Sequence, residues 1–168
     1  MLAGEYSSWL KRRSTLSTVC FLLVAGLLCA FAFSPWHLFP VLLVSFSLLL
    51  GALSVARGLR QAFVYGWVFG TGYFVGGLYW LEHPFVIARL GSSAGFAAVL
   101  VLSATLGLSV ATVCLFSKLS RLRGLKLCVA FAALWTLAEW VRSSIPLGGF
   151  PWNLVGYTWA FSDELIQI

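Results

Sequence analysis

Charged residues are scarce in this sequence. Only 10% of the 168 residues are charged and five of these are acidic, whereas 61% are hydrophobic. An ordinary soluble domain carries about 25% charged residues. A short chain has a large surface for its volume and needs that polar coat in water. The shortage excludes an ordinary soluble domain and predicts that lipid surrounds most of the surface.

Metal-binding and disulfide patterns are also missing. The cysteines lie within apolar runs, without CxxC spacing or a nearby histidine, at Cys20, Cys29, Cys114 and Cys128. Structural metal sites and disulfide frameworks depend on such spacing. We therefore interpret the cysteines as small apolar side chains in lipid, and we expect neither a metal nor a cofactor.

The excess of positive charge is not arranged for binding nucleic acid. Eleven Lys and Arg give a formal charge of +6, but they occur in short clusters between apolar runs. A nucleic-acid interface gathers its cations on one face or along one helix. We expect no nucleic-acid partner.

Long apolar runs are abundant. A bilayer core about 30 Å thick needs roughly 17–25 helical residues, and continuous runs without period-two alternation favour helices over a barrel. Five helices are predicted, at 16–33, 38–55, 62–81, 94–116 and 125–141. Pro40 suits a first helical turn, and Pro84 marks the end of the third helix. The predicted fold is all-α, a polytopic transmembrane helix bundle that begins with an antiparallel hairpin.

The cations alternate between connections, and Lys and Arg are retained on the cytoplasmic side of a membrane. Nine share one side: Lys11, Arg12, Arg13, Arg57, Arg60, Lys118, Arg121, Arg123 and Lys126. The other side has two cations and four acidic residues: Arg89, Arg142, Glu82, Glu139, Asp163 and Glu164. This pattern predicts a cytoplasmic segment at 1–15, a transmembrane region at 16–142 and an external interfacial loop at 143–168.

The first apolar run has an alternative interpretation. A basic cluster precedes it and Ala30-Phe31-Ala32 ends it, a pattern that a cleavable signal peptide shares. A retained helix agrees better with the charge alternation of the later connections. We therefore interpret this run as the first helix of the bundle.

The third predicted helix is rich in glycine. Gly66 and Gly70 share one face, and Gly72 and Gly76 share a second. Glycines four residues apart let helix backbones approach closely. The spacing predicts a helix inside the bundle, and we interpret these glycines as packing residues because GxxxG alone is a weak sign of a ligand site.

Three blocks of sequence resemble a known enzyme family. They are 31–35 (FAFSP), 66–74 with 78–80 (GWVFGTGYF, LYW), and 137–142 with 148–157 (LAEWVR, GGFPWNLVGY). Over nearly the whole chain, they resemble the N-terminal membrane part of bacterial apolipoprotein N-acyltransferase. The resemblance implies a multi-pass inner-membrane protein that transfers an acyl chain to the N-terminal diacylglyceryl-cysteine of a lipoprotein. The implied partners are a phospholipid acyl donor, the diacylglyceryl-modified apolipoprotein and membrane lipids.

Members of this family carry their chemistry in an external nitrilase-like domain. A Cys nucleophile, a Glu general base and a Lys that stabilises the oxyanion act there, and the domain follows the membrane helices. The present sequence ends at Ile168, and its cysteines lack the basic neighbours that favour a thiolate. We therefore expect no catalytic residue here, and we interpret the chain as a fragment that is inactive alone.

The candidate site residues lie around the end of the fifth predicted helix. Glu139 and Arg142 share a helical face, either as a local ion pair with Arg142 reaching the head groups or as groups that orient phospholipid or the following loop. Aromatic residues of that loop suit the interface, where Trp152 either anchors the loop or lines an acyl-chain entrance. The predicted substrate-binding or loop-supporting residues are Glu139, Arg142, Phe150, Pro151, Trp152 and Tyr157.

Two alternatives belong to other classes of protein. One is a small transporter or channel subunit, and the other is a non-catalytic membrane scaffold. Transporters place ionisable groups or broken helices near the bilayer midplane, whereas the charges of this chain occur at helix ends. This difference favours the lipid enzyme over the transporter.

Overall fold

The computed structural model describes residues 14–145, 149–160 and 162. These residues form helices and their connections, with no strand among them, so the all-α prediction is confirmed. Some residues used above lie outside the described ranges, namely Lys11, Arg12, Arg13, Gly148, Asp163 and Glu164.

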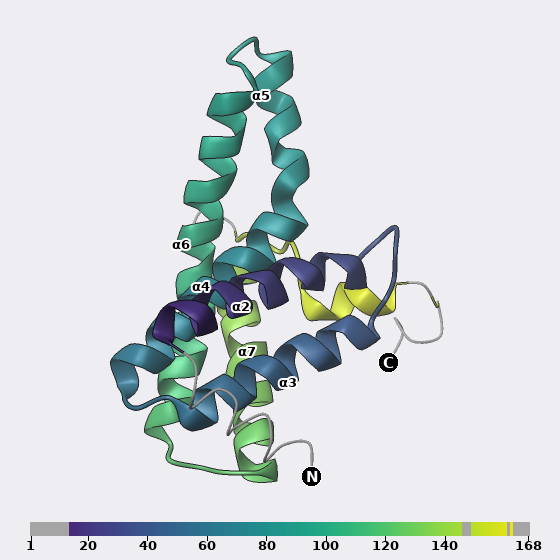
Figure 1. Ribbon diagram of the computed structural model, residues 1–168. Coiled ribbons are helices and arrows are strands. Elements are labelled where there is room, and N and C mark those ends of the chain that lie inside the picture. The colour runs from purple at the N-terminus through teal and green to yellow at the C-terminus, as the bar shows by residue number, and fades with distance from the viewer. Residues whose placement is uncertain (1–13, 146–148, 161, 163–168) are drawn as a thin grey trace.

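Each predicted helix has a counterpart (Figure 1). The elements in chain order are α2 (Thr15–Leu28), the 3₁₀ turn η1 (Cys29–Ala32), α3 (Pro40–Val55), α4 (Leu59–Leu78), η2 (Tyr79–Glu82), α5 (His83–Ile87), α6 (Ser92–Leu119), α7 (Leu125–Ser144) and η3 (Val155–Trp159). Pro40 occupies the first turn of α3, as expected. The chain doubles back after η1, so α2 and α3 form the predicted antiparallel hairpin.

The prediction that Pro84 ends a helix is wrong. α4 already ends at Leu78, and Pro84 lies in the first turn of α5, where its missing N–H costs no intrahelical hydrogen bond. The chain reverses after α5, at Arg89 (φ 59°) and Gly91 (φ 86°). Proline therefore begins a helix here, and the turn into α6 occurs at the residues with positive φ.

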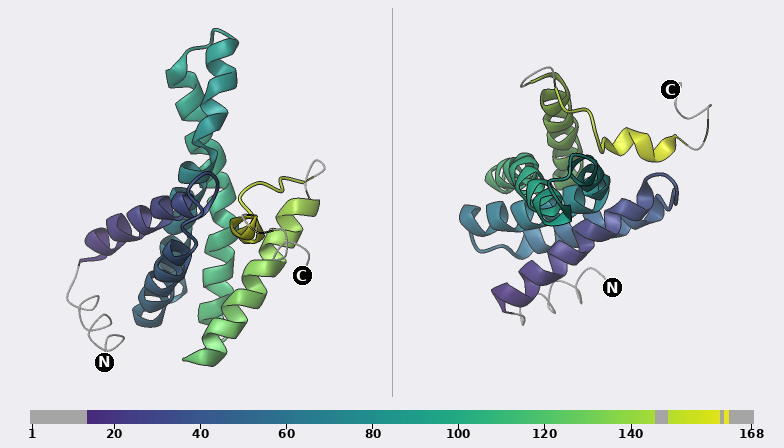
Figure 2. Two further views of the ribbon diagram at one scale, coloured as in Figure 1. Left: turned by 90° about the vertical axis from the view of Figure 1, so that its right-hand side faces the viewer. Right: turned by 90° about the horizontal axis from the view of Figure 1, so that it is seen from above.

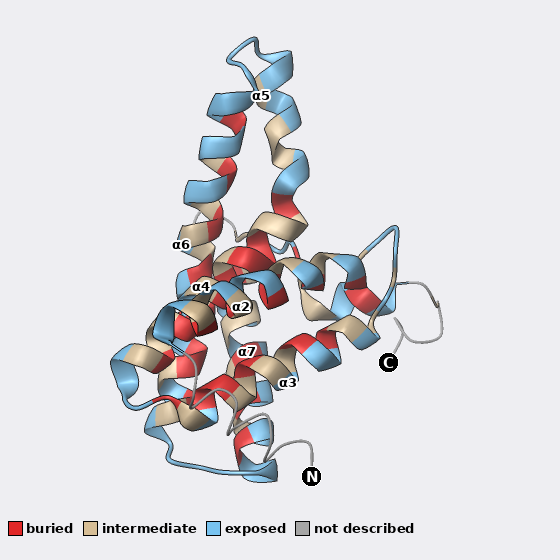
Figure 3. Ribbon diagram, in the orientation of Figure 1, coloured by how far each residue is buried: buried red, intermediate tan, exposed pale blue. Residues whose placement is uncertain are grey.

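Among the described residues, two helical segments are long and apolar enough to cross a bilayer by length and composition. They are Thr15–Ala32 and Ser92–Leu119, each with a mean hydropathy of 2.3, and α3 is a shorter apolar helix. Large apolar side chains also face outwards on the other helices, such as Leu43 on α3 and Val129 on α7, which are 60% and 62% exposed. Figure 3 shows exposed residues along these helices. Water tolerates few contiguous apolar surfaces of this kind, so the bundle suits lipid.

α4 is the central helix, as its glycines predict. Gly66 and Gly70 lie against α6, where an added Cβ would come within 2.8 Å of Cys114 and Val110 respectively. Gly72 and Gly76 lie against α2, next to the backbone of Leu23 and Leu27. Three large side chains of α4 fill the core, Phe69, Tyr73 and Phe74. Both predicted glycine faces are therefore confirmed as close helix contacts.

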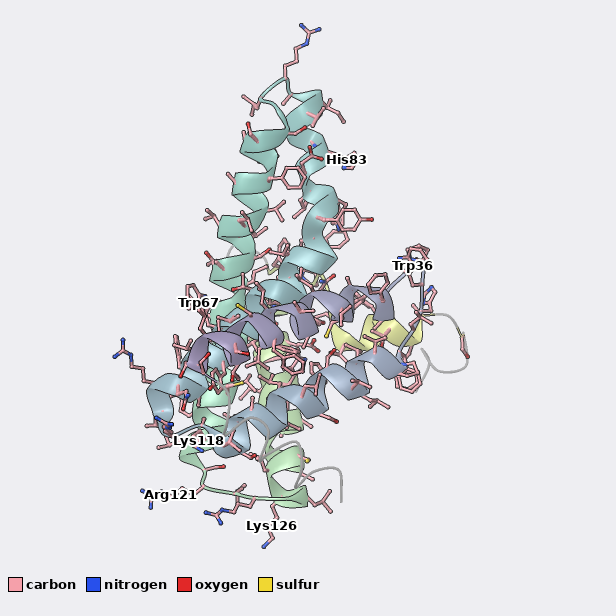
Figure 4. The ribbon with its side chains drawn as sticks, viewed as in Figure 1. Trp36, Trp67, His83, Lys118, Arg121 and Lys126 are labelled. Atoms are coloured by element: carbon pink, nitrogen blue, oxygen red, sulfur yellow. The ribbon has the colours of Figure 1, made fainter. Side chains whose placement is uncertain are left out.

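α4 and α6 form a long hairpin that extends beyond the other helices, with α5 at its tip (Figures 1 and 2). The connections α3–α4 and α6–α7 lie towards the opposite end of this hairpin. Figure 4 shows Lys118, Arg121 and Lys126 at that end and His83 near the tip. The cations of these two connections are thus separated from the α5 end along the long axis of the molecule.

Candidate functional site

The last two turns of α7 position Glu139 and Arg142. α7 continues to Ser144, beyond the predicted end at 141, so Arg142 lies inside the helix and not in a connection. It is 7% exposed, which excludes a guanidinium that reaches out to head groups. A cation in the last helical turn is also favoured by the helix dipole. Burial of this charge requires polar partners close by.

Arg142 finds those partners in the loop that follows α7. Its Nη1 donates to the carbonyl oxygens of Phe150, at 2.8 Å, and of Trp152, at 2.6 Å. The Phe150 N–H donates in return to the Arg142 carbonyl, at 2.8 Å. The guanidinium carbon lies 5.0 Å from the ring centroid of Phe74 on α4. One buried side chain therefore fixes two carbonyls of the loop, since hydrogen bonds to charged groups are stronger than neutral ones.

Glu139 holds the loop further along. Its Oε1 accepts a hydrogen bond of 2.8 Å from the N–H of Val155, the first residue of η3. Glu139 and Arg142 make no direct ion pair: in the described ranges the one ion pair within contact distance joins Glu82 and His83. The charges of Glu139 and Arg142 still interact electrostatically, and each side chain binds loop backbone. Both side chains therefore hold the loop through its backbone, at two different places.

A third contact comes from α4, and the sequence did not indicate it. The buried Tyr73 hydroxyl donates to the Asn153 carbonyl at 2.6 Å, across 80 residues of chain. Asn153 is 9% exposed and has φ 54°, a left-handed conformation that asparagine adopts more readily than most residues. Its side chain lies over Gly77, where a Cβ would collide with the Asn153 amide. The asparagine stands out in a glycine-rich aromatic loop, which could have marked it as a contact residue. The sequence does not identify Tyr73 as its partner, because Tyr73 lies 80 residues earlier in the chain.

The aromatic residues of the loop divide into a buried and an exposed set. Phe150 packs against the core, whereas Trp152 and Tyr157 are 50% and 47% exposed. The Trp152 ring lies 5.2 Å from that of Trp80, and the Trp159 ring lies 4.8 Å from that of Phe39. Pro151 is exposed. The loop thus has a polar inner side held by α4 and α7 and an aromatic outer side.

An apolar groove of about 640 Å³ runs between α6 and α7 and reaches Arg142. Its lining residues are Thr105, Leu106, Ser109, Thr112, Val113, Phe116, Leu134, Leu137, Ala138, Val141, Arg142 and Ile145. One end is therefore close to the buried guanidinium, and most of the wall is hydrocarbon. Such a groove suits an extended apolar chain with a polar group near one end.

The described site positions a loop and contains no nucleophile with a general base. Cys29 and Cys114 are buried in helix contacts, and Cys20 and Cys128 are exposed on helices away from the loop. No group of three potential metal ligands occurs in the described ranges. The chemistry of these residues is therefore hydrogen bonding and aromatic packing.

The known proteins that are similar to this chain all point to one family. Residues 25–168 match the family model described as the apolipoprotein N-acyltransferase N-terminal domain. Each of the following relatives is named apolipoprotein N-acyltransferase. The Allorhizobium ampelinum relative is 40% identical over 145 residues, covering 80% of this chain and 27% of the relative. The Rhodopseudomonas palustris relative is 35% identical over 176 residues, covering 98% of this chain and 30% of the relative. The Rickettsia typhi relative is 35% identical over 154 residues, covering 89% of this chain and 29% of the relative. The chain thus spans less than a third of the length of these relatives.

Proposed function

Because this chain belongs to the apolipoprotein N-acyltransferase N-terminal domain family, we propose that it is the membrane part of an enzyme that N-acylates lipoproteins. In this proposal the enzyme lies in the bacterial inner membrane and crosses it several times. It takes an acyl chain from a phospholipid and transfers it to the α-amino group of a diacylglyceryl-modified cysteine. A nitrilase-like domain outside these residues performs the chemistry, and the chain alone is inactive.

The loop at 149–160 is the part of the chain that we assign to this activity. The observation that carries the assignment is the double hydrogen bond from Arg142 to the carbonyls of Phe150 and Trp152. It holds the exposed Trp152 and Tyr157 in fixed positions at the end of α7. In our proposal this surface lies beneath the catalytic domain, and Trp152 lines the entrance for the acyl chain. The groove beside Arg142 then accommodates the hydrocarbon of the phospholipid donor.

The proposed orientation follows from the two basic connections. Arg57 lies between α3 and α4, Arg60 lies in the first turn of α4, and Arg121 and Arg123 follow α6. These positions are towards the end of the α4–α6 hairpin that is opposite α5. Lys and Arg are retained on the cytoplasmic side. We therefore propose that this end is cytoplasmic and that the loop after α7 is external.

A transporter is a weaker explanation of the buried charges. A solute pathway needs ionisable groups that face a water-filled route. Arg142 and Glu139 instead use their hydrogen bonds on loop carbonyls and an amide. This arrangement favours a structural task for both charges over solute coordination.

A chimaeric protein tests the proposal. The chain is joined to the remaining C-terminal part of the Allorhizobium ampelinum relative, in place of the segment that it matches, and is expressed in cells depleted of their own N-acyltransferase. We expect mass spectrometry to detect N-acylated lipoproteins with the chimaera and none with the chain alone. A chimaera that reaches the membrane folded but leaves the lipoproteins without the N-acyl group would contradict the proposal, as would N-acylation by the chain alone.

A substitution in the same chimaera tests the entrance. Trp152→Ala is expected to raise the KM for phospholipid about tenfold, because an aromatic contact and its buried area are lost. The measurement is release of lysophospholipid at varied phospholipid concentration. Trp140→Ala is the matched control, since Trp140 is a tryptophan on α7 that is 64% exposed. Unchanged phospholipid turnover in Trp152→Ala would contradict the proposal that Trp152 lines the acyl-chain entrance.

A further inference from the structure

A second cavity lies at the opposite end of the bundle from the loop. It has a volume of about 610 Å³ and lies between the C-terminal ends of α3 and α6 and the start of α7. Its walls include Ser117, Lys118, Arg121, Arg123, Gly124 and Leu127. Figure 4 shows Lys118 and Arg121 at this end. The proposed acyl transfer does not use this cavity.

Three cations line the cavity and no described carboxylate pairs with them. The one ion pair in the described ranges joins His83 and Glu82, near the far tip of the molecule. Lys118 is half-buried, and its Nζ donates to the carbonyl of Leu53 at 3.1 Å, which fixes the ammonium at the cavity wall. Arg121 and Arg123 are exposed on the α6–α7 connection. Cations gathered around a concavity without a counter-charge favour an anionic ligand.

A buried hydroxyl provides an independent indication. Ser117 is 1% exposed and lines the cavity, and its Oγ has no hydrogen-bond partner among the described residues. A buried hydroxyl without a partner is costly, and such groups are uncommon in folded proteins. An acceptor oxygen bound in the cavity would satisfy this donor.

The start of α7 adds a favourable electrostatic field. Its N-cap is Gly124, which makes no side-chain capping hydrogen bond. The first backbone N–H groups of a helix have no intrahelical acceptor, and that end carries the positive pole of the helix dipole. Both features favour a phosphate group.

We propose that this cavity binds the phosphate group of an anionic phospholipid. The lining is not purely polar, because Leu53, Leu122 and Leu127 contribute apolar walls that suit the glycerol and the first carbons of acyl chains. A small inorganic anion would leave these walls uncovered. The cavity also lies at the basic end of a membrane bundle, where anionic head groups are attracted to cations between helices. The ligand is thus a structural lipid at the end opposite the loop.

Native mass spectrometry of the purified chain in detergent tests this site. The probes are phosphatidylglycerol, phosphatidylcholine and inorganic phosphate, each titrated separately. We expect one phosphatidylglycerol molecule per chain to bind at this cavity about tenfold more tightly than phosphatidylcholine, with no displacement by millimolar phosphate. Lipid in the groove between α6 and α7 should not depend on Arg121 or Arg123, which do not line that groove. The double variant Arg121→Gln/Arg123→Gln is expected to weaken phosphatidylglycerol binding about tenfold or more.

Matched variants distinguish a site from general attraction to cations. Arg57→Gln/Arg60→Gln removes the same charge from exposed arginines that do not line the cavity, and binding should stay unchanged. Ser117→Ala keeps every charge and should weaken binding about threefold through one lost hydrogen bond. Equal weakening by both arginine pairs overturns the proposal, and so does displacement by inorganic phosphate. If the Arg121/Arg123 variant is unfolded, unchanged binding in Ser117→Ala overturns it.

Discussion

Arg142→Ala is expected to release the loop from α7 and to destabilise the bundle by about 3 kcal/mol. The variant leaves the carbonyls of Phe150 and Trp152 without their donor, and hydrogen bonds to a charged group contribute about 1.5–3 kcal/mol each. The variant also uncovers the face of Phe74. Because 1 kcal/mol corresponds to about 2–4 °C for a chain of this size, we expect the melting temperature in detergent to fall by roughly 10 °C.

Two measurements separate release of the loop from general damage. Chymotrypsin should cut Arg142→Ala after Trp152 or Tyr157 well before it cuts the helices. Arg142→Lys should be intermediate, because an ammonium lacks the planar fork that the guanidinium offers. Arg60→Ala removes an exposed arginine from the first turn of α4 and should change neither result. Equal melting temperatures for Arg142→Ala and the parent chain would refute the role assigned to this side chain.

Gly26→Ala is expected to separate α2 from α4, at a cost of about 3 kcal/mol. An added Cβ would collide with the carbonyl oxygen of Phe69 and lie 2.9 Å from the backbone nitrogen of Tyr73. Backbone atoms inside a helix cannot rotate away, so overpacking here should reach the upper end of the usual range of about 1–3 kcal/mol. In an uncrowded helix the same substitution is stabilising by roughly 1 kcal/mol, so the expected sign is reversed.

Thermal unfolding in detergent measures this effect. Gly58→Ala is the matched control, because no atom lies within 4 Å of its added Cβ and its backbone is extended. The contact also reaches the loop, since the displaced residue Tyr73 donates to the Asn153 carbonyl. A melting temperature for Gly26→Ala at or above that of Gly58→Ala would show that the helices can separate without cost.

The sequence predicts the helices well because hydrophobic length decides where they form. The apolar runs that form α2, α3 and α6 can be recognised in the sequence without knowing which helices pack against them. The glycines of α4 identify its two contact faces. Pro84 was misinterpreted because proline is tolerated in a first helical turn as readily as it ends a helix. Local patterns leave that choice open.

The contacts of the candidate site were harder to predict. Spacing places Glu139 and Arg142 on one helical face, which suggests that they pair, but it does not show that a returning loop offers competing acceptors. The partnership of Tyr73 with Asn153 depends on how α4 meets a loop 80 residues later. The basic cavity likewise depends on α3 and α6 ending side by side, although the sequence identifies its cations.

The length of α6 has a geometric consequence for the surrounding bilayer. Its 28 residues rise about 42 Å, whereas the hydrocarbon of a typical bilayer is about 30 Å thick. Full immersion would demand a lean of about 45° from the bilayer normal, beyond the usual range of roughly 0–40°. One end of α6 must therefore emerge. If the basic end lies at the inner surface, as proposed, the emerging end carries Ile87 and Leu90 to the level of the outer head groups, where these apolar side chains, 82% and 63% exposed, would contact the polar edge of the bilayer.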